Sequence, residues 1–262
     1  MGSATESARA VLRASAPADG SDLATAAALL DAARVLAESS QLRSAVADAT
    51  APVTAREAVV RAVFAGVADP AAVDLLVGAA SQRWSAAGDL VDAVEELGIR
   101  AASAAAPDVD LERELFQIAR TVSGSPELEL ALGSRIGSST SKAELVRSLL
   151  NGRASEAAVV VVSALIRSPR GRRVRQLLSR ATEIVADQRG RTVATVTSAV
   201  PLTAEQRDRL MATLSARYGA AISVNAVVDP ALVGGLRVQV ADDLIDASVA
   251  GRIAELRQRL AG

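Results

Sequence analysis

The sequence predicts a mainly α-helical protein that ends in a small α/β domain, and two features carry this prediction. Half of the 262 residues are apolar but only 2% are aromatic, so the core must consist of small, closely packed aliphatic side chains, as in helix bundles. The run from Arg191 to Val200 is instead rich in Val and Thr, whose branched Cβ atoms favour extended strands. We therefore expect helices before this run and a mixed α/β fold from it onward.

The helical region contains an internal repeat with an offset of 86 residues. ARVLAESSQL, which begins at Ala33, aligns with ARTVSGSPEL from Ala119, and TAREAVVRAVFAG from Thr54 aligns with TSKAELVRSLLNG from Thr140. An Ala-rich chain can match itself by chance, but aliphatic residues coincide between these identities as well, which is typical of a duplicated packing pattern. The repeat predicts two tandem helical bundles.

Three domains are predicted from this organisation: a first bundle over residues 1–106, a second over 107–189 and the α/β domain over 190–262. The segment Gly88–Ala106 closes the first copy, yet it also lies where the second copy needs an opening helix. We expect this segment to serve both bundles.

Each copy is predicted to cap its short internal helix in the same way. Thr54-x-x-Glu57 in the first copy and Ser141-x-x-Glu144 in the second match the capping box, in which a hydroxyl and a carboxylate accept hydrogen bonds from otherwise unpaired backbone N–H groups. These acids are therefore interpreted as helix caps and not as catalytic groups.

The last domain is predicted to have the order β-α-β-β-α, with a short additional strand before its final helix. Alternating apolar residues in ISVNAVV and GLRVQVA indicate half-buried strands. Thr203-x-x-Gln206 is a third capping box, and Gly219 stands where a helix-ending glycine is expected. The expected elements are strand 192–200, helix 204–218, strand 222–228, strand 235–241, a short strand near 244–246 and helix 249–260.

The composition excludes several kinds of chemistry. The chain has no Cys and no His, which removes Cys nucleophiles, Ser-His triads and zinc sites built on those ligands. Its 29 basic and 30 acidic residues leave a net charge of −1, which argues against general nucleic-acid binding. No stretch approaches the roughly 20 apolar residues that span a bilayer. We predict no catalytic, metal-binding or cofactor-binding residue and no direct membrane insertion, and protein partners are favoured.

The run VGGLRVQVADDLIDAS, which begins at Val233, is the first candidate for chemistry. Its aspartates could hold a divalent cation only if the backbone folded back sharply, and Gly234-Gly235 lacks the GK[ST] sequence and following helix of a phosphate-binding loop. We interpret the glycines as a tight entry into a strand and Asp242-Asp243 as a hairpin turn. Asp246 and Ser248 are interpreted as caps of the last helix.

The strongest charge feature is the basic cluster from Arg167 to Arg175, which includes Arg172 and Arg173. A solvated helix start is the plainest interpretation. Arginines at the N-terminal end of a helix oppose its dipole, however, so the cluster also suggests acidic neighbours from a partner. An alternative function is a cytoplasmic RNA-binding regulator that uses this cluster, although the scattered aromatic residues offer no stacking platform.

Three segments of the last domain resemble the C-terminal domain of the δ subunit of F-type ATP synthase, a relative of the mitochondrial oligomycin-sensitivity-conferring protein. They are TSAVPL (Thr197–Leu202), DPALVGGLRV (Asp229–Val238) and LIDASVAGRI (Leu244–Ile253), the last of which is similar to the family's VIDGSVRGRL pattern. LAESSQLRSAV and VTAREAVVRAVF resemble the family's N-terminal bundle. The candidate family-motif and partner-binding residues are Gly234, Gly235, Asp246, Ser248, Arg252, Arg172 and Arg173.

The resemblance implies a non-catalytic stator subunit that connects the α/β head to the peripheral stalk and holds the head still against the torque of the rotor. The N-terminal bundle would receive the N-terminal helices of the α subunits in grooves between its own helices, and the C-terminal domain would bind the C-terminal helices of the b subunit. No cofactor and no nucleic acid is expected. The chain would lie at the cytoplasmic face of the bacterial cell membrane, as a peripheral component of the complex.

The second bundle copy departs from the usual family pattern and makes this chain longer than typical members. Such enlarged δ chains resemble those of actinobacteria, with which the composition rich in Ala, Arg and Val agrees. In some of those organisms δ is fused to a membrane-anchored b-type helix. The sequence shows no such helix, so b is a separate chain or the sequence belongs to a longer one. Which copy meets the α subunits stays open.

Overall fold

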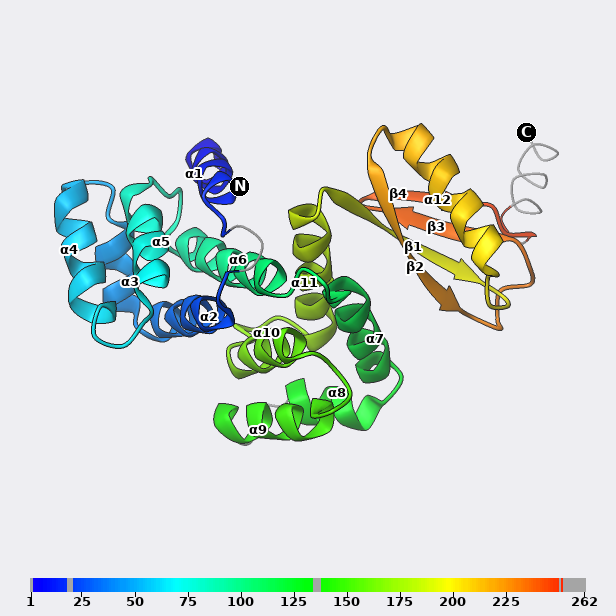
Figure 1. Cartoon of the computed structure of the whole chain (residues 1–262), viewed down its shortest axis with the longest axis horizontal. Helices are drawn as coiled ribbons and strands as arrows, with labels where there is room; N and C mark the ends of the chain where they lie inside the picture. The colour runs from blue at the N-terminus through cyan, green and yellow to red at the C-terminus, as the bar shows by residue number, and fades with distance from the viewer. Residues whose placement is uncertain (1, 18–20, 134–137, 250, 252–262) are drawn as a thin grey trace, which may run out of the picture. The chain divides into compact units, whose positions relative to one another are not determined.

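The computed structural model describes residues 2–17, 21–133, 138–249 and 251. They form two compact units, Met1–Val185 and Ala186–Gly262 (Figure 1), and each unit has its own hydrophobic core. The three-domain division into 1–106, 107–189 and 190–262 stays a prediction.

The described part of the first unit is helical. Their bounds are α1 Ser3–Ala14, α2 Leu23–Glu38, α3 Ser40–Ala47, α4 Val53–Phe64, α5 Pro70–Ser81, α6 Ala87–Ala105, α7 Leu111–Ser123, α8 Pro126–Gly133, α9 Ser139–Leu150, α10 Glu156–Arg167 and α11 Val174–Gln188. Helix α11 runs across the limit between the two units, and its buried residues from Val174 to Val185 belong to the first core.

The sequence repeat is visible in the helix bounds. An offset of 86 residues carries α3, α4 and α5 onto α8, α9 and α10 residue for residue, and it carries α1 onto the middle of α6. Helix α6 contacts α2 and α3 on one side of the repeat and α10 on the other. The first copy therefore comprises α1–α5, the second comprises α7–α11, and α6 serves both, as predicted for Gly88–Ala106.

Small residues allow α2 and α6 to approach closely at the centre of the first unit. A Cβ added at Gly98 in α6 would lie 2.7 Å from Leu30 Cγ and 3.1 Å from the Leu30 backbone nitrogen. The side chains of Ala26, Leu29 and Val94 around this contact are fully buried. Close packing of small aliphatic side chains thus forms the core, as the composition predicted.

The predicted capping box at Thr54 and Glu57 is wrong. Helix α4 already begins at Val53, after Pro52, and has no side-chain cap. Pro52 occupies the N-cap position, where it offers no side-chain acceptor, and Val53 is the first helical residue, so Thr54 lies inside the first turn. Glu57 instead accepts a hydrogen bond of 2.8 Å from Ser81 Oγ, which ties α4 to the end of α5.

The predicted capping box at Ser141 and Glu144 is also wrong, although its helix is capped. Helix α9 begins at Ser139, and Ser138 Oγ accepts a hydrogen bond of 3.0 Å from the Ser141 backbone N–H. The run of hydroxyl residues before the helix offers several possible caps, and the earliest of them closes the first turn.

The second unit is a four-stranded sheet with a helix against it (Figure 1). Its elements are β1 Arg191–Ser198, α12 Ala204–Tyr218, β2 Ala221–Val228, β3 Leu236–Val240 and β4 Asp243–Asp246. The strand order is β2-β1-β3-β4, in which β1 and β2 are parallel and the other pairs are antiparallel. The core consists of inward-facing residues of the strands and of α12, among them Val196, Leu214 and Val238.

These elements agree with the predicted order as far as the described residues extend. Thr203 and Gln206 form the predicted capping box, with bonds of 2.9 and 3.2 Å, and Gly219 ends α12 at φ 65°. The predicted final helix 249–260 lies, except for residues 249 and 251, outside the described residues.

Candidate functional site

The three family-like segments of the second unit meet at one end of the sheet. Ser198, the last residue of β1, pairs with Val228 at the end of β2 and with Leu236 at the start of β3. The Asp229 backbone N–H donates a hydrogen bond of 2.9 Å to the Ser198 carbonyl, and the Ala247 N–H donates one of 2.9 Å to the Leu236 carbonyl. Segments 197–202, 229–238 and 244–249 thus converge there, and we call this region the sheet-end surface.

The paired glycines allow the backbone of this surface to pack closely, as predicted. Gly234 and Gly235 have φ angles of 130° and 79°, which L-residues with a side chain rarely adopt. A Cβ at Gly235 would lie 2.4 Å from the Ala247 carbonyl oxygen. The Gly234 carbonyl accepts a hydrogen bond of 3.1 Å from the Val249 N–H.

Asp246 and Ser248 shape the same turn. Asp246 Oδ1 accepts a hydrogen bond of 2.9 Å from the Ser248 N–H, and Ser248 Oγ accepts one of 3.0 Å from the Gly251 N–H. The hydrogen bonds from Ser248, together with the nearby charge of Arg237, hold the pKa of Asp246 below its usual range. These groups therefore form local hydrogen bonds in the turn, and their predicted role as caps of the last helix stays a prediction because most of that helix lies outside the described residues. Arg252 lies outside the described residues.

The acids of this run do not gather into a metal site. The hairpin turn is Ala241-Asp242, with Ala241 at φ 49°, and Asp243 is already the first residue of β4. The predicted Asp242-Asp243 turn is therefore displaced by one residue, because Val240 pairs with Asp243 in the ladder. Asp243 accepts a hydrogen bond from the Tyr218 hydroxyl. Within the described stretches of the chain, no group of three or more metal-ligating side chains converges.

Each segment of the sheet-end surface exposes one valine. Val200, Val233 and Val249 are 68%, 80% and 42% exposed, respectively. Apolar side chains on a rigid turn surface of this kind suit protein contacts better than they suit small-molecule chemistry.

A second candidate surface is an apolar groove in the second copy. It encloses a cavity of about 280 Å³ between α7, α8, α9 and α10. Its aliphatic lining includes Ile118, Val122, Leu128, Leu132, Leu149 and Leu150, and Glu114 and Arg153 add charged groups. Leu149 is 40% exposed.

Two equivalent positions of the first copy are more deeply buried. The offset of 86 residues relates Ile118 to Ala32 and Leu150 to Phe64, and both first-copy residues are buried at 2% and 4% exposure. Ile118 and Leu150 are only partly buried. The two copies thus share a helix pattern but differ in burial at these two positions, whereas Val63, the equivalent of Leu149, is 40% exposed like Leu149 itself.

Residues 99–260 match the family model described as ATP synthase delta (OSCP) subunit. The chain belongs to this family. The match extends from the second half of α6 through the second copy and the second unit, so α1–α5 lie outside it.

Full-length relatives agree with the family match. The delta subunit of ATP synthase from Leifsonia xyli subsp. xyli is 46% identical over 265 residues, which cover 100% of both chains. The delta subunit from Kineococcus radiotolerans is 44% identical and covers 93% of this chain and 87% of the relative. The corresponding Streptomyces avermitilis subunit is 38% identical, with coverages of 92% and 87%. The enlarged form is thus shared with actinobacterial delta subunits.

Membership of the delta family gives this chain a mechanical role and not a catalytic one. This chain is a non-catalytic connector in the stator of the F-type ATP synthase, where it serves ATP synthesis and proton transport from the periphery of the cytoplasmic side of the bacterial membrane. Within the residues that the structure describes, no helix has the length and apolar character to cross a bilayer.

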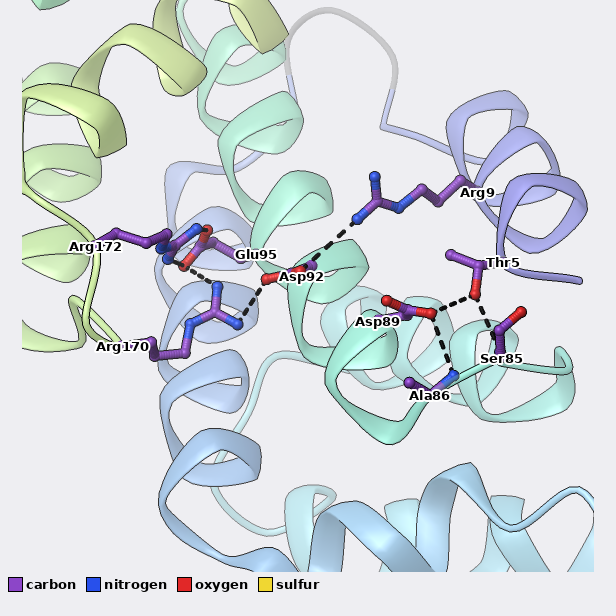
Figure 2. A network of polar contacts seen from close by, with 9 residues as sticks. All are labelled: Thr5, Arg9, Ser85, Ala86, Asp89, Asp92, Glu95, Arg170 and Arg172. Atoms are coloured by element: carbon purple, nitrogen blue, oxygen red, sulfur yellow. Dashed lines mark hydrogen bonds and ion pairs between the residues drawn. The ribbon is translucent and has the colours of Figure 1, made fainter. Parts of the chain in front are cut away.

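Three arginines of the basic cluster are paired with acids of the first unit. Arg170 and Arg172 both donate hydrogen bonds to Glu95 of α6, as Figure 2 shows, and Arg167 pairs with Asp31 of α2. The inference that a partner supplies the acidic neighbours is therefore wrong for these arginines. Local sequence could not show the pairing, because the acids lie far away in the chain.

Arg173 differs from its neighbours in the cluster. Its side chain is exposed, while its backbone N–H donates a hydrogen bond of 3.1 Å to Gln176 Oε1 at the start of α11. The hydrogen bond caps the helix, and the exposed side chain leaves Arg173 a candidate for partner contact.

Proposed function

We propose that this chain joins the catalytic head to the peripheral stalk through two separate surfaces. The groove of the second copy receives the N-terminal helix of an α subunit, and the sheet-end surface binds the C-terminal end of the b helices. The observation that carries this proposal is the groove, because it is apolar, open and built from a copy that lies within the family match.

The shape and lining of the groove favour an amphipathic helix as its occupant. Four helices surround a largely aliphatic cavity, and some of its lining side chains, such as Leu149, are exposed. Grooves of this kind between helices receive the apolar face of an amphipathic helix. Glu114 and Arg153 could pair with charges that flank the apolar face of the incoming helix. The first copy, with Ala32 and Phe64 buried at the equivalent positions, offers a poorer receptor.

The sheet-end surface suits the end of a helical stalk. Its three exposed valines lie on turns held by backbone hydrogen bonds and by the closely packed glycines. Such a surface loses little conformational entropy on binding. Two attachments on one chain also strengthen each other, because the bound surface keeps the other at a high effective concentration.

Calorimetry with two peptides tests the assignment. We expect an α N-terminal peptide and a b C-terminal peptide to bind the full chain independently. Leu149→Asp should weaken binding of the α peptide about tenfold or more and leave the b peptide unaffected, because a charge in an apolar pocket is costly. Val233→Asp should show the reverse pattern.

Two matched variants serve as controls. Leu145→Asp changes an exposed leucine on the same helix, 41% exposed but outside the groove lining, and Val67→Asp changes a valine of the first copy that is 83% exposed. Neither should alter either affinity. Loss of α-peptide binding in Val67→Asp, with Leu149→Asp unaffected, would assign the α helix to the first copy instead.

A further inference from the structure

Charges of opposite sign meet where the second copy packs against α2 and α6. The turn between α10 and α11 contributes Arg167, Arg170 and Arg172, and the opposite side contributes Asp31 of α2 with Asp92 and Glu95 of α6. Arg170 lies 2.7 Å from both Asp92 and Glu95, and Arg172 pairs with Glu95 through two bonds of 2.8 and 2.7 Å. Arg167 pairs with Asp31. In these pairs the arginines come from the turn between α10 and α11 and the acids come from α2 and α6.

The centre of this cluster is shielded from solvent, which strengthens its interactions. Glu95 is 5% exposed. Burial alone would raise the pKa of Glu95, but hydrogen bonds from Arg172 and the charges of Arg170 and Arg172 outweigh it and hold the pKa below its usual range. A carboxylate buried in this way needs its partners, because an unpaired buried charge is strongly unfavourable.

The three arginines are not part of the sequence pattern that the two copies share. An offset of 86 residues relates Arg167, Arg170 and Arg172 to Ser81, Trp84 and Ala86, none of which is charged. At the equivalent turn of the first copy, Thr5 Oγ1 donates a hydrogen bond of 2.6 Å to Asp89 and accepts one of 3.0 Å from the Ser85 N–H. Figure 2 shows the two turns on either side of α6, one with hydroxyl contacts and one with paired arginines.

Asp92 connects the two sides of α6. It pairs with Arg170 at 2.7 Å and lies 4.0 Å from Arg9 of α1 (Figure 2). One turn further along α6, Glu96 pairs with Arg13 of α1 and with Arg100 at 2.9 and 2.8 Å. The acidic residues of α6 thus fasten α1 and the second copy to the same helix.

We propose that the pairs of Arg167, Arg170 and Arg172 form a charge-matched joint that holds the second copy in one fixed orientation against the shared helix α6 and against α2 of the first copy. Apolar contacts of α10 with α2 and α6 keep the copies together, but apolar packing is non-directional. Bidentate arginine–carboxylate pairs fix a geometry. The joint turns the enlarged helical region into a single stiff arm, whichever partner each surface binds.

Distance measurements between spin labels test the joint. Because the chain has no Cys, Ala62→Cys on α4 and Ser148→Cys on α9, both exposed, provide unique labels on the two copies. We expect a narrow distance distribution in the otherwise unchanged chain. Glu95→Gln, and separately Arg170→Gln with Arg172→Gln, should broaden it about twofold or more.

A charge swap distinguishes the joint from a general loss of stability. Glu95→Arg combined with Arg172→Glu should give a narrower distribution than either single variant, because the pair is re-formed. Asp74→Asn, which removes a pair with Arg61 within the first copy, should leave the distribution unchanged. The distance distribution of a label pair within the first copy, Thr54→Cys with Ala71→Cys, should stay narrow throughout and show that this copy remains folded.

Two outcomes would overturn the proposal. One is an unchanged distribution between α4 and α9 in folded Glu95→Gln and in the double arginine variant. The other is equal broadening by Asp74→Asn. Because no peptide is present in these measurements, their failure would leave the two proposed binding surfaces untouched, and failure of peptide binding would likewise leave the joint standing.

Discussion

At the scale of single residues, the sheet-end surface depends on backbone geometry that only glycine supplies without strain. Gly235 has a φ of 79°, and a Cβ at this position would lie only 2.4 Å from the Ala247 carbonyl oxygen. Gly219 has a similar φ of 65° but open space around it. The two positions therefore separate the cost of a left-handed backbone from the cost of close packing.

Gly235→Ala should destabilise the second unit by about 2 kcal/mol or more, since backbone strain of about 1–2 kcal/mol is joined by a clash. Gly219→Ala should cost about 1 kcal/mol, from strain alone. Urea unfolding of both variants, followed by circular dichroism, measures the difference. Equal losses would mean that the contact with Ala247 relaxes freely and that the glycine is required for its φ angle alone.

At the scale of elements, α6 concentrates the ionisable groups that stabilise the first unit. Burial raises the pKa of Glu96, but the hydrogen bond from Arg100 and the charge of Arg13 outweigh this and lower it, as Arg172 and Arg170 do for Glu95. A carboxyl group with a lowered pKa in the folded state stabilises that state above its unfolded pKa.

The first unit should therefore lose stability as the pH falls below about 4.5, the ordinary Glu value. Its stability should be nearly constant from there toward neutral pH, as far as these two groups contribute. Unfolding by urea at about pH 7 and about pH 4, monitored by fluorescence, measures the effect. Glu95→Gln should flatten the dependence, whereas Glu205→Gln on the exposed face of α12 should not; a profile unchanged by Glu95→Gln would contradict this account.

Several elements could be predicted from the sequence because their signals are local. The aliphatic positions that coincide in the repeat predicted the equivalent helices correctly. The capping box of α12 was predicted correctly because Thr203 and Gln206 have no competing cap residue next to them. The caps predicted at Thr54 and Ser141 were wrong because α4 and α9 begin earlier, directly after Pro52 and Ser138. The choice among adjacent caps depends on backbone geometry that a spacing rule does not contain.

The candidate site was only partly predictable. The segments that form the sheet-end surface could be picked out from the sequence because they match the family's pattern, and the partner-binding role of their residues stays a prediction. The partners of Arg170 and Arg172 were not, since Glu95 lies far away in the chain and no periodicity links the two. The groove depends on Ile118 and Leu150 replacing Ala32 and Phe64, a pair of apolar exchanges whose effect on packing appears only in three dimensions.

At the scale of the whole molecule, the two units have separate cores, which share no residue within the described stretches of the chain. The single Trp of the sequence, Trp84, is buried in the first core, and the single Tyr, Tyr218, packs against the second. Each unit thus contains its own natural reporter of folding.

Tryptophan and tyrosine emission should therefore report independent unfolding of the two units. Gly235→Ala should shift the transition seen through Tyr218 to lower urea concentration and leave that seen through Trp84 in place, because the cores do not share residues. Fluorescence at separate excitation wavelengths in one titration makes the comparison. Parallel shifts of both transitions would show that the units unfold as one.

The helix shared by the two copies also determines how such a chain can grow. Because α6 ends one bundle and begins the next, the repeat behaves like the stacked units of a solenoid, in which neighbours share an interface. Each added period contributes five helices and extends the array without a linker. The same rule holds for a deletion. A deletion that leaves every bundle complete must remove one whole repeat of 86 residues, at whichever residue it begins.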